Sequence, residues 1–245
     1  MSRPASPDDA NYWLVVPAAG TGRRMRQVTP KQYLPLAGKN VITHALAPFD
    51  RNPLIQSIIV VLRSHDAYWT QHAPAISKPL QLVDGGPTRG QSVLNGLNVL
   101  TRVAADNDWV LIHDAARPCL TDADLESLLL KLHADDVGGL LASPLEETLK
   151  HADDMGTDGM LRVKSSIASK DIWRALTPQM YRFGPLRRAV ASCITAGVEV
   201  ADEAYAMEKA GHDPALVKGR GDNIKVTTPA DLTLAEAILR NHGIC

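Results

Sequence analysis

Short apolar runs rich in β-branched residues alternate along the chain with longer segments whose apolar residues recur every three or four positions. The runs are bounded by Gly, Asp or Pro, and a short apolar run with such boundaries is typical of a strand buried on both faces. The expected strands are Tyr12–Val16, Ser57–Leu62, Leu80–Val83 and Trp109–His113. Because strands that alternate with helices build βαβ units, the pattern predicts an α/β fold with a mostly parallel sheet.

Two of the expected helices have clear start signals. One follows Thr121, which suits an N-cap, has acidic residues in its first turn, and carries leucines at i, i+3, i+4 and i+7. The other opens at Thr228 and Pro229 and is expected to end before Gly243. We interpret both as structural helices.

The chain is long enough for one large domain, with 245 residues of which 45% are hydrophobic. We assign residues 12–245 to that domain and residues 1–11 to a disordered leader, since Pro, Ser and Asp stand where a signal peptide needs an apolar core. No later run reaches the length of a membrane span. A polar stretch, Glu146–Asp171, interrupts the alternation and predicts either a protruding arm or a loop.

The charge of the chain is almost balanced, with 26 basic and 27 acidic residues and a formal net charge of −1. A global cationic field that would hold nucleic acid or an anionic membrane is therefore excluded, and any affinity for phosphate must be local. Cys119, Cys193 and Cys245 lie far apart and form no CxxC pair, which argues against a disulfide framework or a zinc site. These features favour a reducing compartment, the cytoplasm.

The first segment with candidate chemistry is Pro17–Met25, which follows the first expected strand. Its small residues let the main chain approach a ligand closely, and their N–H groups can cradle phosphate oxygens. These residues are Ala18, Ala19, Gly20 and Gly22. We therefore predict that this loop binds the phosphates of a nucleotide.

The same region is locally cationic, because no acidic residue lies between Asp9 and Asp50. The basic residues there are Arg23, Arg24, Arg26, Lys31 and Lys39. This concentration predicts a polyphosphate site, the alternative being a surface turn with solvated arginines. Two rival phosphate motifs are absent: Met25 stands where a dinucleotide fingerprint needs its third glycine, and no GKS or GKT sequence of a P-loop occurs.

A second loop, Asp84–Val93, lies between a strand and a helix, where open α/β sheets present ligand-facing residues. Gly85 and Gly86 would let the backbone pass close to a flat base. Ser92 could form a hydrogen bond to that base, or could be only a first-turn helix residue.

Two aspartates are candidate metal ligands. Asp114 directly follows an apolar strand and would sit at its carboxyl end, where a carboxylate suits Mg²⁺ together with bound phosphates. Asp222 lies near Lys225 at another loop-to-strand boundary. Neither Asp222 nor Lys225 indicates a site by itself.

Taken together, these segments resemble one family, the 2-C-methyl-D-erythritol 4-phosphate cytidylyltransferases of the non-mevalonate isoprenoid pathway. The resemblance runs from about Trp13 to Leu239, and its motifs occur in family order and spacing: PAAGTGRRM, PKQYL, HDAARP, ALTPQ, DEAYAMEKAG and GRGDNIKVT. It implies a doubly wound, Rossmann-like nucleotidyltransferase domain and a homodimer in which an arm, about Thr148 to Ile172, reaches over the partner. It also implies transfer of CMP from CTP to the polyol phosphate, with Mg²⁺ and with release of pyrophosphate.

The resemblance assigns roles at the nucleotide end of the site. Arg24 and Lys31 match the residues that stabilise the charge building on the α-phosphate, a role that fits because phosphoryl-type transfer depends mainly on positioning and on cations at the developing charge. Asp114 matches a carboxylate near the metal and the sugar. The positions that match the surroundings of cytosine and ribose are Ala18, Ala19, Gly86 and Ser92.

At the acceptor end, Lys225 matches a contact to the substrate phosphate. Thr148 matches a residue that serves the polyol phosphate of the neighbouring subunit, and Thr177 belongs to the same neighbourhood. The family usually has an arginine shortly before the tryptophan that corresponds to Trp173. This chain has Lys170 there, which supplies charge but no bidentate fork. Ala201 stands where a threonine is expected, which removes one hydroxyl contact.

Three other functions are alternatives to this one. A cytidylyltransferase for another polyol phosphate, such as ribitol 5-phosphate, would share the CTP motifs. A non-catalytic nucleotide-binding module would bind CTP without turnover, and the joint retention of Arg24, Lys31, Asp114 and Lys225 argues against it. A nicotinamide-dependent oxidoreductase would fit the α/β alternation, but this chain lacks the third glycine and the ribose-binding acid that such an enzyme needs.

Overall fold

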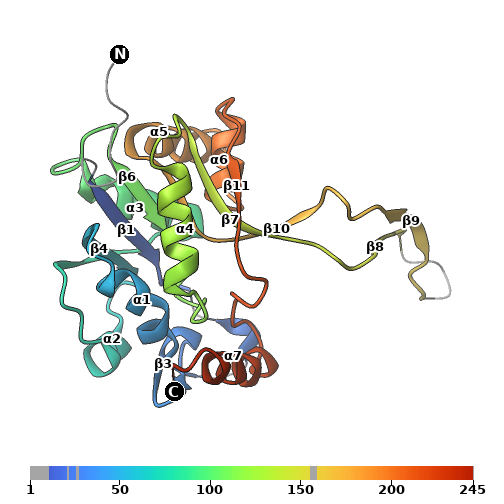
Figure 1. Cartoon of the computed structure of the whole chain (residues 1–245), viewed down its shortest axis with the longest axis horizontal. Coiled ribbons are helices and arrows are strands. Elements are labelled where there is room, and N and C mark those ends of the chain that lie inside the picture. Colours follow the sequence, from blue (N-terminus) through green and yellow to red (C-terminus); the bar gives the residue numbers. More distant parts are fainter. Residues whose placement is uncertain (1–10, 21, 26–27, 155–158, 245) are drawn as a thin grey trace.

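A seven-stranded sheet forms the centre of the protein, in the order β11-β7-β10-β6-β1-β4-β5 (Figure 1). The computed structural model describes residues 11–20, 22–25, 28–154 and 159–244, so the expected leader lies almost entirely outside the described residues. The strands are β1 (Tyr12–Pro17), β4 (Ile55–Leu62), β5 (Leu80–Asp84), β6 (Trp109–Ile112), β7 (Gly138–Pro144), β10 (Trp173–Arg182) and β11 (Ala215–Lys218). Only β10 among them is antiparallel to its neighbours, so the predicted mostly parallel sheet is confirmed.

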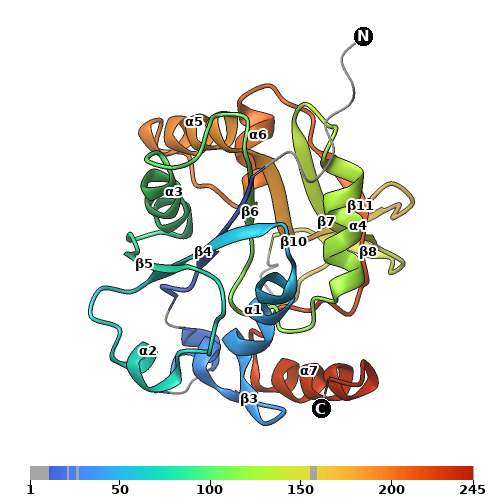
Figure 2. The same ribbon diagram turned by 60° about the vertical axis from the view of Figure 1, so that its left-hand side comes forward.

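Helices cover both faces of this sheet, as a doubly wound fold requires (Figure 2). The helices are α1 (Val41–Arg51), α2 (Ala67–His72), α3 (Arg89–Leu100), α4 (Asp122–Leu132), α5 (Phe183–Thr195), α6 (Glu203–Lys209) and α7 (Pro229–Asn241), with short 3-10 turns η2 (Arg23–Met25) and η3 (Lys31–Tyr33). Alternate residues of β1 point to opposite faces: Leu14 and Val16 pack with α1 and α4, and Val15 packs with α3 and α5. Burial on both faces explains why β1 is apolar throughout.

The two structural helices begin as predicted. Thr121 caps α4 by accepting a hydrogen bond from the backbone N–H of Asp124 at 3.1 Å. Thr228 and Asp231 form a capping box at the start of α7, and Gly243 follows the helix with φ of 69°. Helix α7 packs beside the short hairpin of β2 (Pro35–Leu36) and β3 (Lys39–Asn40).

One strand prediction needs correction. The run at 80–83 does form a strand, but β5 is an edge strand and is not buried, with Leu80 36% and Leu82 47% exposed. An apolar run does not reveal whether a strand has one neighbour in the sheet or two, and β5 pairs with β4 only.

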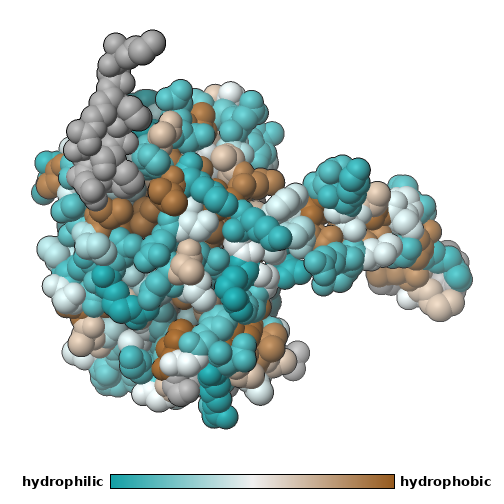
Figure 3. All heavy atoms as spheres, viewed as in Figure 1, coloured by the Kyte–Doolittle hydropathy of each residue, from teal (hydrophilic) through white to brown (hydrophobic). Residues whose placement is uncertain are grey.

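The polar stretch forms a projecting arm. Strands β8 (Leu149–Ala152) and β9 (Val163–Ile167) pair antiparallel to each other, away from the main sheet (Figure 1). Apolar residues lie exposed along this arm, including Leu161 at 62% and Val163 at 63%, and brown patches mark its far end in Figure 3.

Candidate active site

The site lies at the carboxyl ends of neighbouring parallel strands. Strand β1 has β4 on one side and β6 on the other, and the chain crosses from β5 back to β6 through α3. This reversal of strand order opens a crevice in doubly wound folds. A pocket with a cavity volume of about 350 Å³ occupies the crevice, lined by the loops that follow β1, β5 and β6.

The loop after β1 forms one wall of the pocket through Ala18, Ala19, Gly20 and Gly22. Gln32 fixes the shape of this loop, because its side-chain amide donates to the carbonyl oxygens of Ala18 at 2.7 Å and Gly20 at 3.3 Å. Gly22 has φ of 64°, and a Cβ at this position would lie 3.1 Å from Cγ of Lys31. The loop therefore needs glycine both for its backbone conformation and for the place of Lys31.

The loop after β5 forms the opposite wall through Gly86 and Ser92. The Ser92 hydroxyl accepts from the N–H of Gly86 at 3.1 Å and donates to the carbonyl of Thr88 at 2.9 Å, so it braces the loop that it lines. Gly85 lies behind the lining residues, where a Cβ would come within 2.5 Å of Cβ of Ala19. The two loops therefore pack against each other at Gly85, where a side chain would not fit.

Arg24, Lys31 and Lys225 bring positive charge to the pocket. The Lys31 ammonium donates to the carbonyl oxygen of Val226 at 2.8 Å, which ties the loop after β1 to the segment that precedes α7. Burial, together with the nearby charge of Lys225, lowers the pKa of Lys31 to about 8. The three side chains make this part of the pocket wall cationic, and the binding of polyphosphate there stays a prediction.

Asp114 is the acidic centre of this cationic pocket. Its Oδ2 lies 2.7 Å from Nζ of Lys225 and 3.7 Å from Nε of Arg117, and its Oδ1 lies 3.3 Å from Nε of Arg89. Burial by itself would raise the pKa of Asp114, but the three cations outweigh it and hold that pKa well below its usual range. Asp114 is thus ionised, and both of its oxygens already face cations.

Thr177 supports Asp114 from behind. The Thr177 hydroxyl accepts from the backbone N–H of Asp114 at 3.1 Å and lies 3.0 Å from Nδ1 of His113. Burial lowers the pKa of His113 to about 4, so the ring is neutral and Thr177 can donate to its Nδ1. Thr177 is only 3% exposed and does not line the pocket, so it lies behind the site, and the expectation that it belongs to the neighbourhood of the polyol phosphate stays a prediction.

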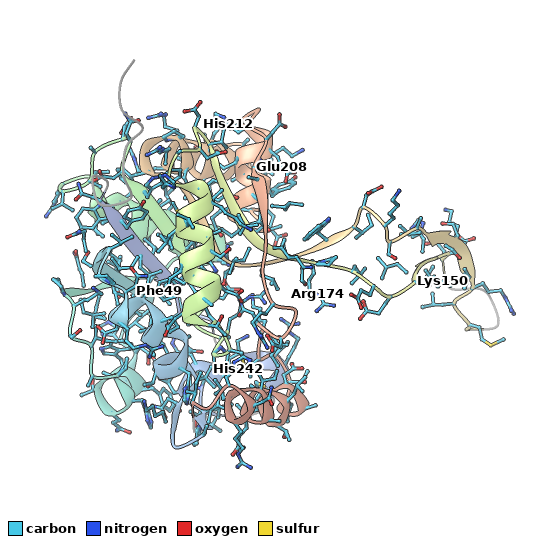
Figure 4. All side chains as sticks on the ribbon, in the orientation of Figure 1. Phe49, Lys150, Arg174, Glu208, His212 and His242 are labelled. Carbon is cyan, nitrogen blue, oxygen red and sulfur yellow. The ribbon has the colours of Figure 1, made fainter. Side chains whose placement is uncertain are left out.

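Three other expected site residues lie away from the pocket. Thr148 and Lys170 are exposed on the arm, which Figure 4 shows extending from Arg174 at its base to Lys150 near its far end. Asp222 is paired with Arg220 at 2.6 Å and with His242 at 3.1 Å.

The placement of Asp222 does not support its expected role as a second metal ligand. Among the described residues no group of three or more His, Cys, Asp or Glu side chains is arranged to hold a metal ion. Asp114 would also have to leave Lys225 and Arg89 to bind one. The protein side chains therefore do not fit a resident Mg²⁺ site.

Sequence reasoning missed three charged residues of this region. Arg89 lines the pocket, Glu203 holds it through two hydrogen bonds, and Arg117 faces Asp114. The position of Arg117 within HDAARP, three residues after Asp114, was an available signal. No local pattern connects Arg89 with Glu203, which is 114 residues further along the chain.

Comparison with known proteins places the chain in one family. The chain matches the family described as 2-C-methyl-D-erythritol 4-phosphate cytidylyltransferase over residues 12–241. A protein of that name from Pseudomonas aeruginosa is 50% identical over 222 residues, which cover 90% of this chain and 93% of the relative. Another of that name, from Pseudomonas putida, is 48% identical over 90% of this chain and 92% of its own.

Comparison of the fold with solved structures points to the same family. A crystal structure of the Francisella tularensis 2-C-methyl-D-erythritol 4-phosphate cytidylyltransferase matches with a TM-score of 0.79 and 34% identity, over 94% of this chain and 100% of that chain. No helix among the described residues has the length and apolar character to cross a membrane. Sequence, fold and pocket agree, and the chain belongs to the 2-C-methyl-D-erythritol 4-phosphate cytidylyltransferase family of nucleotidyltransferases.

Proposed function

We propose that this protein transfers CMP from CTP to 2-C-methyl-D-erythritol 4-phosphate in isoprenoid precursor biosynthesis. The products are 4-diphosphocytidyl-2-C-methyl-D-erythritol and pyrophosphate. The observation that carries the proposal is the pocket itself, which joins a loop of small residues to the cations Arg24, Lys31 and Lys225 at the carboxyl ends of β1 and β6. A triphosphate and a phosphorylated acceptor both need such positive charge. Family membership supplies the identity of the two substrates.

The reaction needs no covalent intermediate on the protein. A phosphate oxygen of the acceptor attacks the α-phosphorus of CTP, and the bond from that phosphorus to the oxygen bridging to the β-phosphate breaks. Pyrophosphate leaves with the bridging oxygen and its electron pair. Arg24 and Lys31 stabilise the negative charge on the α-phosphate oxygens during the attack, when their electrostatic effect is greatest.

The nucleotide lies between the two loops. Ala18, Ala19 and Gly86 allow a flat base to approach the main chain, and Ser92 keeps its loop in shape. Gly85 lets the two loops pack together behind them. Gly20 and Gly22 bring N–H groups toward the triphosphate.

Magnesium enters this scheme with the substrate. Mg²⁺ keeps near-octahedral oxygen coordination and is often held by phosphates and water. Since both oxygens of Asp114 face cations, we propose that the protein takes CTP as its magnesium complex, with the triphosphate as the main ligand.

The acceptor phosphate binds at Lys225, and residues of a second subunit complete the site. Thr148 and Lys170 are exposed on an arm that projects away from the main sheet. This placement supports a role for them at the site of a neighbouring chain. The exposed apolar residues of the arm, such as Val163, also need a surface to cover them. We therefore propose a homodimer with shared sites.

The buried free thiols of Cys119 and Cys193 fit a reducing, cytoplasmic setting.

Pyrophosphate release, measured across a panel of nucleotides and polyol phosphates, tests the proposal. We expect turnover with CTP and 2-C-methyl-D-erythritol 4-phosphate, and little with UTP, ATP or ribitol 5-phosphate. Omission of Mg²⁺ should stop turnover with CTP and 2-C-methyl-D-erythritol 4-phosphate. Preference for ribitol 5-phosphate would assign the other polyol acceptor, and CTP binding without turnover on any acceptor would indicate a non-catalytic module.

A further inference from the structure

Glu203 is a carboxylate with no exposed surface that is tied to the pocket through one arginine. It is the first residue of α6 and is 0% exposed. Its two oxygens accept from Nη1 of Arg89 at 2.7 Å and from Nη2 at 3.1 Å. Glu203 does not line the pocket, whereas Arg89 does. Any effect of Glu203 on the site must therefore pass through Arg89.

The bidentate pair controls what Arg89 can offer to Asp114. An arginine has five N–H donors, of which the two ends of the fork here face Glu203. From Arg89, Asp114 therefore receives one hydrogen bond only, in which Nε–H donates to Oδ1 at 3.3 Å. Its Oδ2 remains 2.7 Å from Nζ of Lys225.

Glu203 is held firmly in this position. The neighbouring Asp202 accepts from the backbone N–H of Tyr205 at 2.9 Å and from the side-chain amide of Gln179 at 3.1 Å. The other end of that amide accepts from the backbone N–H of Ala204 at 2.8 Å. The start of α6 is thus fastened to β10, on both sides of Glu203.

Without the charge of Glu203, the fork of Arg89 would have one anion in reach, the carboxylate of Asp114. Bidentate pairing of arginine with a carboxylate is stronger than a single contact through Nε. Arg89 would then draw Asp114 toward itself and away from Lys225. Lys225 would lose the partner that holds its ammonium in place.

We propose that Glu203 is a positioning residue for the transfer reaction, which keeps Arg89 from capturing Asp114 and so keeps Lys225 in place for the acceptor phosphate. This inference rests on the proposed function, because it assumes that Lys225 binds that phosphate. It predicts that Glu203, which lies outside the pocket, affects the binding of the acceptor phosphate and not the binding of CTP.

The test is Glu203→Gln, measured as separate KM values for the two substrates. We expect the KM for 2-C-methyl-D-erythritol 4-phosphate to rise about tenfold or more, as for loss of a charged hydrogen bond, and the KM for CTP to change less than about threefold. Asp108→Asn is the matched control, because Asp108 is also a buried carboxylate and accepts from Trp13 at 3.0 Å and Asn11 at 3.2 Å at the opposite end of β6. That control should lower the melting temperature and leave both KM values unchanged.

A double-variant cycle tests whether the effect passes through Arg89. Arg89→Lys keeps the charge but removes the fork. In that background Glu203→Gln should raise the acceptor KM by less than about threefold, since residues that act as a unit are not additive. Should Glu203→Gln fail to fold, Glu203→Asp is measured instead. Its side chain is too short to accept from both Nη1 and Nη2 of Arg89, so one end of the fork is released toward Asp114, and the same KM criterion applies.

Unchanged KM values as in the Asp108 control, equal rises in both KM values, or a fall in kcat alone would overturn the inference, and so would full additivity with Arg89→Lys. A wild-type protein that releases no pyrophosphate with any polyol phosphate would instead contradict the proposed function.

Discussion

Arg24 and Lys31 contribute positive charge to the pocket from opposite ends of one loop. We expect Arg24→Ala and Lys31→Ala each to lower kcat roughly 10²- to 10³-fold, as for loss of one group that stabilises transition-state charge. Melting temperatures should stay near that of the wild type, because neither side chain belongs to the apolar core. Lys131→Ala, an exposed lysine in the last turn of α4, is the control and should keep full turnover. Turnover within about threefold of wild type for both pocket variants would contradict their assignment.

The pKa of Lys31, lowered to about 8 by burial and by Lys225, predicts a pH dependence. Lys31 carries its charge below that pKa and loses it as the pH rises through about 8. We therefore expect kcat/KM for CTP, which reports the free enzyme, to fall on the alkaline side of this value. Lys31→Arg should lack this alkaline fall even where its rate is lower, because arginine stays charged. The same fall in Lys31→Ala would show that another group titrates.

At the residue scale, the sequence predicted which loops carry the chemistry but not how their side chains pair. Ala18, Gly86 and Asp114 could be found because each follows an apolar strand, and the carboxyl ends of parallel strands meet at one edge. The ion pair of Asp114 with Lys225 could not, since charges far apart in sequence carry no mark of their partners. The same limit led to the expectation that Asp114 and Asp222 bind metal, when both carboxylates are paired with cations.

At the scale of elements, the loop after β1 can be tested through two glycines with similar backbone. Gly22 has φ of 64° beside Lys31, and Gly197 has φ of 69° after α5 with no atom within 4 Å of an added Cβ. Alanine at either position should reduce stability by about 1–2 kcal/mol, the usual penalty of the left-handed conformation. Only Gly22→Ala should also lower kcat/KM for CTP, because its Cβ would press on Lys31. Equal kinetic effects of the two variants would show that the loop tolerates a side chain.

The starts of helices were easier to predict from the sequence than the burial of strands. Thr121 and Thr228 mark helix starts through local hydrogen bonds that depend on residues three positions away. The burial of a strand depends instead on its neighbours in the sheet, which is why the strand at Leu80 was expected to be buried and lies at the edge. The arm was predicted only as one of two possibilities, because a polar stretch fits both an arm and a loop.

At the scale of the whole molecule, subunit mixing tests the shared site. One homodimer carries Lys31→Ala, and the other carries Thr148→Val with Lys170→Ala. Each alone should be nearly inactive. When subunits exchange freely, half of the dimers are mixed and one of the two sites in each is intact, so activity should recover to roughly a quarter of wild type. Native mass spectrometry of differently tagged chains verifies the exchange. Mixed dimers without recovery would show that each arm serves its own chain or none.

The projecting arm has a consequence for how the enzyme responds to its own abundance. If catalysis needs the arm of a second chain, then isolated subunits are idle, and specific activity follows the monomer–dimer equilibrium. Dilution below the dissociation constant of the dimer would silence the protein without unfolding it. The output of the reaction would then rise more steeply than in proportion to the amount of protein made, a threshold set by an arm that lies outside the domain that binds the nucleotide.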